Sequence, residues 1–302
     1  MTIQKIEANG ITLAIENRGP HDAVPLILVR GQGSQMAHWP GELIEGFVSA
    51  GFRTVMFDNR DVGLSQRFAL PGLLGDADEI LDLLRRGETP KAAYGIEDMA
   101  RDVIGLMDAL GLDKAHVFGI SMGGMITQQV ILEAPERLLS ATIVMSACRP
   151  AAQVGMGGQA ALVERAEQLL VRTRTREEYL SDQVAEHAKW GSPGYPMPEA
   201  EIRAMGGVAY DRGVDADGLN RQVIALSCAP DRRPGLAQSE VPCLVINGED
   251  DTLVPLELGK EIADTIPASE FRAVPGMGHI ITPLLAPLIV ETVVEFIARR
   301  VG

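Results

Sequence analysis

Apolar and polar positions along the first thirty residues follow the two-residue period of β-strands. This pattern predicts strands at about 3–8 and about 11–17, and the apolar run at 24–29 predicts a third. An Asn9-Gly10 pair separates the first two segments, and this dipeptide is typical of a two-residue hairpin turn. The chain is therefore expected to begin with a β-hairpin and a third strand.

Further along, the apolar residues adopt a helical spacing. Steps of three and four, with charged residues between them and Gly111 at the end, predict an amphipathic helix at about 96–110; its apolar positions are Ile96, Met99, Val103, Leu106 and Leu110. Similar patterns predict helices near 40–51, 122–134, 256–266 and 284–300, and strands at 54–57, 116–120, 141–145, 243–246 and 270–274. Strands that alternate with helices indicate an α/β fold with a mostly parallel, doubly wound sheet.

The alternation stops between two of the late strands. From about 147 to 235 the patterns are helical, glycine and proline form joints such as those at 191–196, and no convincing strand is present. A helical insertion between sheet strands is how a lid is attached to such a fold. We therefore expect a core made of residues 1–146 and 236–302, with residues 147–235 forming a helical cap.

Composition narrows the classes of function. The 302 residues carry a formal net charge of −14, which disfavours nucleic acid and anionic membranes as partners. The N-terminus lacks a basic start followed by an apolar run, and no stretch of 18 apolar residues occurs, so a cytoplasmic location is expected. The three cysteines are far apart and are expected to be buried free thiols. No zinc or dinucleotide motif stands out, so neither a metal nor a cofactor is expected.

The motif that carries chemistry is Gly119-Ile-Ser121-Met-Gly123. It is the single G-x-S-x-G in the chain, and it lies between a predicted strand and a predicted helix. In that context the turn is sharp and strained, flanking glycines let the backbone pass, and the serine hydroxyl is raised above the sheet. Ser121 is therefore the candidate nucleophile.

A serine hydroxyl needs an adjacent base, which is itself oriented by a third group. Gly248-Glu-Asp-Asp251 follows the predicted strand at 243–246, and Gly276-Met-Gly-His279 follows the one at 270–274. Open α/β sheets place their sites at the carboxyl ends of strands, where all three elements lie. The order of serine, acid and histidine predicts His279 as the base and an aspartate of 250–251 as its partner.

With these motifs the chain resembles the α/β-hydrolase group that contains aclacinomycin methylesterase. The likeness also includes Arg30-Gly-Gln-Gly33 with Trp39-Pro40, the segment 58–65, and the segment from Arg221-Gln222 through Asp231-Arg232. The resemblance implies that Asp251, rather than Asp250, is the acid. It also implies that the backbone N–H of Gln32 joins that of Met122 in an oxyanion hole.

Several other residues near these motifs are candidates for the pocket or for the core. Trp39 either lines the pocket or anchors the following helix, and His38 is a candidate substrate contact. Arg30, where many relatives have histidine, either packs or pairs with an acid, or touches substrate. The segment 58–65 is expected to be structural.

Three functions fit this constellation. The first is a carboxylic ester hydrolase that acts on a small molecule through an acyl-enzyme. The second uses the same triad for carbon–carbon bond hydrolysis or as a perhydrolase, and the third is a non-catalytic binding module. Substrate identity and oligomeric state stay open.

Overall fold

A computed structural model of the chain describes residues 3–68, 72–150 and 158–301. It begins with the hairpin of β1 (Gln4–Ala8) and β2 (Ile11–Arg18). Both turn residues have positive φ, 50° at Asn9 and 75° at Gly10, as a type I′ turn requires. The Asn-Gly pair therefore sets the register of this hairpin.

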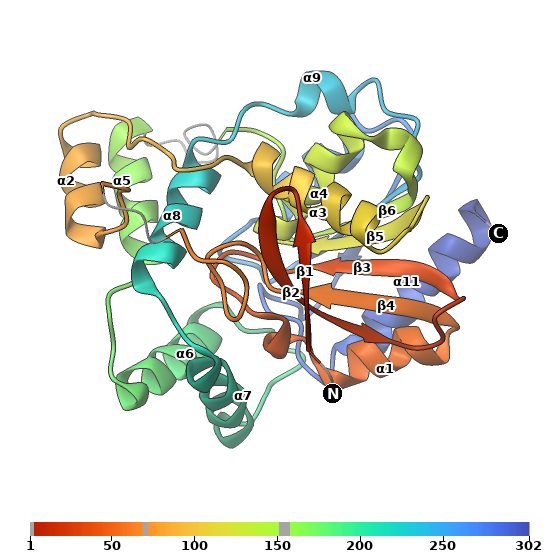
Figure 1. Ribbon diagram of the computed structural model, residues 1–302, viewed down its shortest axis with the longest axis horizontal. Coiled ribbons are helices and arrows are strands. Elements are labelled where there is room, and N and C mark those ends of the chain that lie inside the picture. The colour runs from red at the N-terminus through yellow and green to blue at the C-terminus, as the bar shows by residue number, and fades with distance from the viewer. Residues whose placement is uncertain (1–2, 69–71, 151–157, 302) are drawn as a thin grey trace.

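The remaining strands are parallel and extend one eight-stranded sheet (Figure 1). They are β3 (Val24–Val29), β4 (Phe52–Phe57), β5 (Ala115–Ile120), β6 (Leu138–Val144), β7 (Cys243–Gly248) and β8 (Ser269–Val274). The strand order is β1-β2-β4-β3-β5-β6-β7-β8, with only the β1–β2 and β2–β4 pairs antiparallel. Because β3 lies between β4 and β5, the direction of winding reverses there, and α/β sheets bind ligands at such a switch point.

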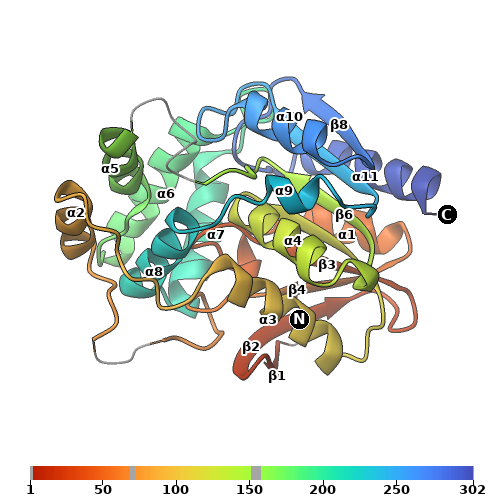
Figure 2. The same ribbon diagram turned by 90° about the horizontal axis from the view of Figure 1, so that it is seen from above.

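Helices cover both faces of the sheet and bury one apolar core on each (Figure 2). On one face lie α3 (Ile96–Ala109), α4 (Met122–Glu133) and α10 (Leu256–Thr265), and on the other α1 (Gly41–Ser49) and α11 (Ala286–Arg300). Ile126 of α4 and Phe47 of α1 are fully buried on their respective faces. This is the doubly wound α/β arrangement that the sequence predicts.

The described residues between β6 and β7 form helices and no strand. These are α5 (Gly158–Leu169), α6 (Arg176–Trp190), α7 (Glu199–Arg212), α8 (Ala216–Ser227) and the short α9 (Arg233–Leu236). Figure 1 shows α5 to α8 gathered beside one end of the sheet. The short α9 instead packs against α4 and α10 through Leu236, which is buried in the core of that face. Of the range 147–235, residues 151–157 lie outside the described residues.

One helix beside this group was not predicted from the sequence. It is α2 (Ala77–Arg85), from the segment between β4 and β5, and Asp76 caps it by accepting the N–H groups of Asp78 and Glu79. Its apolar side packs on α5 and α8 in a separate core cluster that includes Ile80, Leu84, Leu170 and Val223. The helical layer is thus completed by a segment that is distant in sequence.

The described residues bear on two further expectations. All three cysteines are free, but only Cys148 and Cys243 are buried; Cys228 follows the end of α8 and is exposed, which corrects the expectation of three buried thiols. No helix in this part of the chain has the length and apolar character needed to cross a membrane.

Candidate active site

Ser121 occupies a strained turn between β5 and α4. Its φ of 54° and ψ of −120° lie in a region that residues with a Cβ rarely adopt. A Cβ on Gly119 would collide with the carbonyl oxygen of Gly123, and one on Gly123 would collide with that of Val29. Only glycine therefore fits on either side of this turn, which fixes the serine at the carboxyl end of β5.

The imidazole of His279 lies between Ser121 and Asp251. Its Nε2 is 2.9 Å from Ser121 Oγ, and its Nδ1 is 2.7 Å from Asp251 Oδ2. The second carboxylate oxygen of Asp251 accepts the backbone N–H groups of Leu253 and Val254 at 2.9 and 2.8 Å. These bonds fix the carboxylate, so the ring is oriented with Nε2 toward the serine hydroxyl.

The neighbouring Asp250 has a different contact. It is exposed, and its Oδ2 accepts the backbone N–H of Gly276 at 2.9 Å. This bond joins the loop after β7 to the loop after β8. Asp250 thus supports the two loops, whereas Asp251 contacts the imidazole.

The loop that carries His279 is held by the segment after α6. The backbone N–H of His279 donates to the carbonyl of Trp190 at 2.7 Å, and the N–H of Gly278 donates to Ser192 Oγ at 3.0 Å. Ser192 Oγ in turn donates to the carbonyl of Ile280 at 2.6 Å. The sequence did not predict this support, because residues 190–192 form no motif that indicates a contact with His279.

Two backbone N–H groups border the serine. Those of Gln32, in the loop after β3, and Met122, at the start of α4, have no acceptor within the part of the chain that the structure describes. Both residues line the same cavity as Ser121. They are therefore available as donors to an oxygen bound beside the serine.

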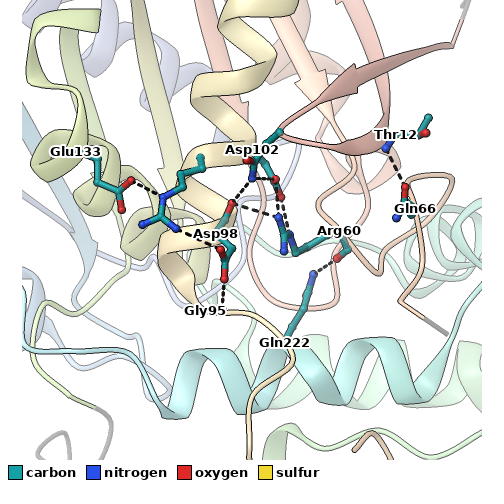
Figure 3. A network of polar contacts seen from close by, with 10 residues as sticks. Thr12, Arg60, Gln66, Gly95, Asp98, Asp102, Glu133 and Gln222 are labelled. Carbon is teal, nitrogen blue, oxygen red and sulfur yellow. Dashed lines mark hydrogen bonds and ion pairs between the residues drawn. The ribbon is translucent and has the colours of Figure 1, made fainter. Parts of the chain in front are cut away.

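The loop after β3 is fixed by Gln222 of α8. Gln222 is fully buried; its Oε1 accepts the N–H of Gly33 at 2.8 Å and its Nε2 donates to the carbonyl of Arg60 at 2.7 Å. Figure 3 shows Gln222 beneath Arg60, whose guanidinium donates to both oxygens of Asp102 on α3, each at 2.7 Å. In the sequence, Gln222 was part of a segment that carries the family resemblance, and no role could be assigned to it.

The segment 58–65 is joined to the same helices. Asp58 accepts the N–H of Met36 at 2.7 Å and the guanidinium of Arg212 in α7 at 2.6 Å. Asp61 accepts two bonds from Arg221 in α8, at 2.8 and 2.9 Å. Burial raises the pKa of Asp58, which shows how far this carboxylate is removed from water. These contacts dock α7 and α8 onto the core beside the loop after β3.

A cavity of about 480 Å³ adjoins Ser121 and His279. The core contributes Gln32, Met122 and His38 to its wall, and the helices between β6 and β7 contribute Leu169, Tyr179, His187, Met205 and Leu219. Burial, followed by the nearby charge of Arg30, lowers the pKa of His38 to about 3, so this ring is neutral. Among the described residues no group of three or more His, Cys, Asp or Glu side chains is arranged to hold a metal.

Trp39 does not line this cavity. It is 4% exposed, packs edge-on against Phe118 with ring centroids 5.8 Å apart, and carries the guanidinium of Arg30 at 4.5 Å from its own centroid. The interpretation of Trp39 as a substrate contact is therefore replaced by a role in the core. Its large apolar surface is buried between the start of α1 and the sheet, where it supports Arg30.

Comparison with known proteins agrees with this architecture. Residues 24–174, half of the chain, match the family model described as the alpha/beta hydrolase fold. The chain is 26% identical to rhodomycin D methylesterase DauP from Streptomyces sp. strain C5, over 97% of this chain and 98% of that protein. It is 25% identical to 3-oxoadipate enol-lactonase 1 from Acinetobacter baylyi, over 88% and 85%.

Among solved structures, the enol-lactonase from Burkholderia xenovorans LB400 superposes with a TM-score of 0.75. The two chains are 25% identical, and the match covers 98% of this chain and 100% of the other. The eight-stranded sheet and the turn at Ser121 agree with the family match over residues 24–174. The chain therefore belongs to the α/β-hydrolase fold family.

Proposed function

We propose that this protein is a carboxylic ester hydrolase that acts on a small-molecule ester through a Ser121–His279–Asp251 triad. The observation that carries the proposal is the hydrogen-bonded chain from Asp251 through His279 to Ser121, at 2.7 and 2.9 Å. The methylesterase and enol-lactonase relatives support an acyl group as the target.

In the proposed reaction, Ser121 Oγ attacks the ester carbonyl while His279 Nε2 takes its proton. The N–H groups of Gln32 and Met122 stabilise the negative charge that develops on the carbonyl oxygen. Asp251 holds the imidazole and stabilises its protonated form, which then protonates the departing alcohol. Water attacks the acyl-enzyme with His279 again as base, and this step releases the carboxylic acid and restores the serine.

We further propose that α5 to α8 act as a cap that selects the substrate. Their side chains complete the cavity wall opposite the sheet, and they hold both the loop of His279 and the loop of Gln32. A cap of this kind excludes water and supplies apolar contacts, while the core supplies the reacting groups.

The test is covalent labelling with a fluorophosphonate, read by mass spectrometry of peptides. One label is expected on Ser121, together with hydrolysis of members of an ester and lactone panel. Labelling that persists in Ser121→Ala would falsify the assignment of the nucleophile. Mass detection of the products separates ester hydrolysis from the carbon–carbon hydrolase and perhydrolase alternatives, and a wild-type protein that takes no label would favour a binding module.

A further inference from the structure

Arg30 places a cation in the cavity wall without an acidic partner. Its Nε and Nη2 donate to Ser34 Oγ at 2.9 and 2.6 Å, and its Nη1 donates to the carbonyl of His38 at 3.4 Å. These acceptors are neutral, and among the described residues no carboxylate lies within ion-pair distance of Arg30. Burial lowers the pKa of the guanidinium to about 9, so its charge is poorly compensated by the protein itself.

Arg30 is adjacent in the chain to a residue that contacts the reacting serine, and its charge reaches the cavity wall. The next residue, Gly31, lies against the Cβ of Ser121. The charge also lowers the pKa of His38 and His187, two other residues of the cavity wall, in each case after burial. The electric field of Arg30 therefore extends into the cavity.

A second cation enters the wall from α5. Arg165 donates to the carbonyl of Leu253 at 3.3 Å, which places it next to the segment that follows Asp251. Burial lowers its pKa, and the charge of Asp251 only partly offsets this. Asp251 itself is bonded to His279, Leu253 and Val254, and no ion pair of Arg165 occurs in the described part of the chain.

The other arginines around the cavity differ in this respect. Arg172 pairs with Asp78 at 2.5 Å and Arg174 with Asp182 at 3.0 Å. The remaining acid of the wall is Glu186, and desolvation by neighbouring side chains, followed by the charge of Asp182, raises its pKa to about 7. A further cation of the wall, Lys189, lies over the ring of Trp190 at 4.4 Å. A chain with a net charge of −14 thus has a cavity in which, among the described residues, two guanidinium groups, those of Arg30 and Arg165, are without acidic partners.

Because desolvated charges in proteins are normally paired, two half-buried guanidinium groups without acidic partners in one cavity indicate that their partner is the ligand. We propose that the substrates are esters that carry a carboxylate, which Arg30 and Arg165 bind beside the reacting carbonyl. This deepens the proposed ester hydrolysis and rests on it. A cavity of this charge also concentrates anions that the rest of the surface repels.

The experiment uses two pairs of probes whose members differ only in whether the carboxylate is free or methylated. One pair, 4-nitrophenyl hydrogen glutarate and methyl 4-nitrophenyl glutarate, has it on the acyl side. The other, 4-acetoxybenzoate and its methyl ester, has it on the alcohol side. For each probe kcat/KM is divided by the rate of hydrolysis in buffer. A charged-to-neutral ratio of about tenfold or more in at least one pair is expected.

In the double variant Arg30→Gln/Arg165→Gln this charged-to-neutral ratio should fall to about one. The two single variants show how much of the decrease comes from each arginine. Arg101→Gln removes the same charge from an exposed pair with Glu133 outside the cavity, and it should keep the wild-type ratio. Ratios at or below one in both pairs for the wild type, or a ratio that the double variant retains, would overturn the proposal.

Calorimetric binding of the four probes to Ser121→Ala gives a readout that does not depend on turnover or on the folding of the arginine variants. Tighter binding of a charged member supports anion recognition even if no probe is hydrolysed, in which case only the proposed ester hydrolysis fails. Equal or weaker binding of both charged members overturns anion recognition and leaves the proposed hydrolysis standing.

Discussion

The side-chain amide of Gln222 in α8 accepts the backbone N–H of Gly33 at 2.8 Å, and so connects the helices between β6 and β7 to the loop that holds Gln32. Its Nε2 is bonded at the same time to the carbonyl of Arg60 at 2.7 Å. Gln222 thus fixes the proposed oxyanion donor without touching Ser121. A displaced loop would weaken stabilisation of the transition state more than binding of the substrate.

Gln222→Ala should therefore lower kcat on the order of 10–100-fold with a smaller change in KM. It should also lower the free energy of unfolding by about 1–3 kcal/mol, because the N–H of Gly33 and the carbonyl of Arg60 lose their buried partner. Steady-state kinetics, normalised to the fraction that a fluorophosphonate can label, separate the two effects. Gln66→Ala removes an exposed amide and is the control. A normal kcat per labelled site would limit Gln222 to a structural role.

Asp250 and Asp251 should differ sharply in their effect on turnover. Asp251→Asn removes the acceptor that orients His279, and a loss in kcat on the order of 10⁴-fold is expected, as for the equivalent change in serine proteases. Asp250→Asn keeps an oxygen that can accept the N–H of Gly276, so its effect should be slight. A larger loss from Asp250→Asn, measured with any ester that the wild type hydrolyses, would contradict the proposed roles.

Ser121→Gly should stabilise the fold while it abolishes hydrolysis. The serine is held at φ 54° and ψ −120°, a conformation that costs a residue with a Cβ about 1–3 kcal/mol. Glycine removes this strain but loses more entropy on folding, so a net gain of about 1 kcal/mol is expected. Ser121→Ala keeps the Cβ and is the matched control. Urea denaturation of the three proteins measures the difference, and equal stabilities for the glycine and alanine variants would argue against strain at this turn.

The cap proposal predicts a change of preference rather than of reaction. Met205 of α7 lines the cavity, so Met205→Ala should enlarge it and favour bulkier acyl groups by roughly tenfold relative to small ones, the range expected for deleted apolar contacts. Val208→Ala, on the exposed side of the same helix, should leave the ranking unchanged. Equal losses toward small and bulky esters in Met205→Ala would indicate that the cap is only a stabilising cover.

The charge of Glu186 should make the preference for charged probes depend on pH. Desolvation by neighbouring side chains and the charge of Asp182 raise the pKa of this solvent-accessible carboxyl to about 7, so the anionic fraction of Glu186 grows as pH rises through this value. Its other close neighbours are Gln183 and Tyr179. The charged-to-neutral ratio of kcat/KM should fall as pH rises through about 7, because the new anion repels the substrate carboxylate. Glu186→Gln should flatten this profile. The ratio cancels any effect of pH that is common to the charged and the neutral probe, and an unchanged slope in the variant would exclude Glu186 as the cause.

The sequence by itself determined the elements and the order in which the reacting groups follow them. Apolar residues repeat every two positions where one face of a strand is buried, and every three to four positions where one face of a helix is buried. Because this repeat is a local property of the chain, the sheet strands and the helices on its faces could be located. The turn at Gly119–Gly123 is partly local, because a Cβ on Gly119 would collide with the carbonyl oxygen of Gly123, four residues further on; the contact that excludes a side chain at Gly123 comes from Val29 of β3. Since parallel strands end at one edge of the sheet, Ser121, Asp251 and His279 could be expected near one another.

Only the tertiary structure decided which side chains meet across these elements. Trp39 became a core residue, Gln222 reached Gly33 from 189 positions away, and α2 joined the helices between β6 and β7. Arg30 was expected either to pack or pair with an acid, or to touch substrate; it packs on Trp39 without an acidic partner in the described residues. Such contacts depend on how whole helices dock. Docking is set by the combined shape of buried surfaces from distant segments, and no local period in the chain encodes it.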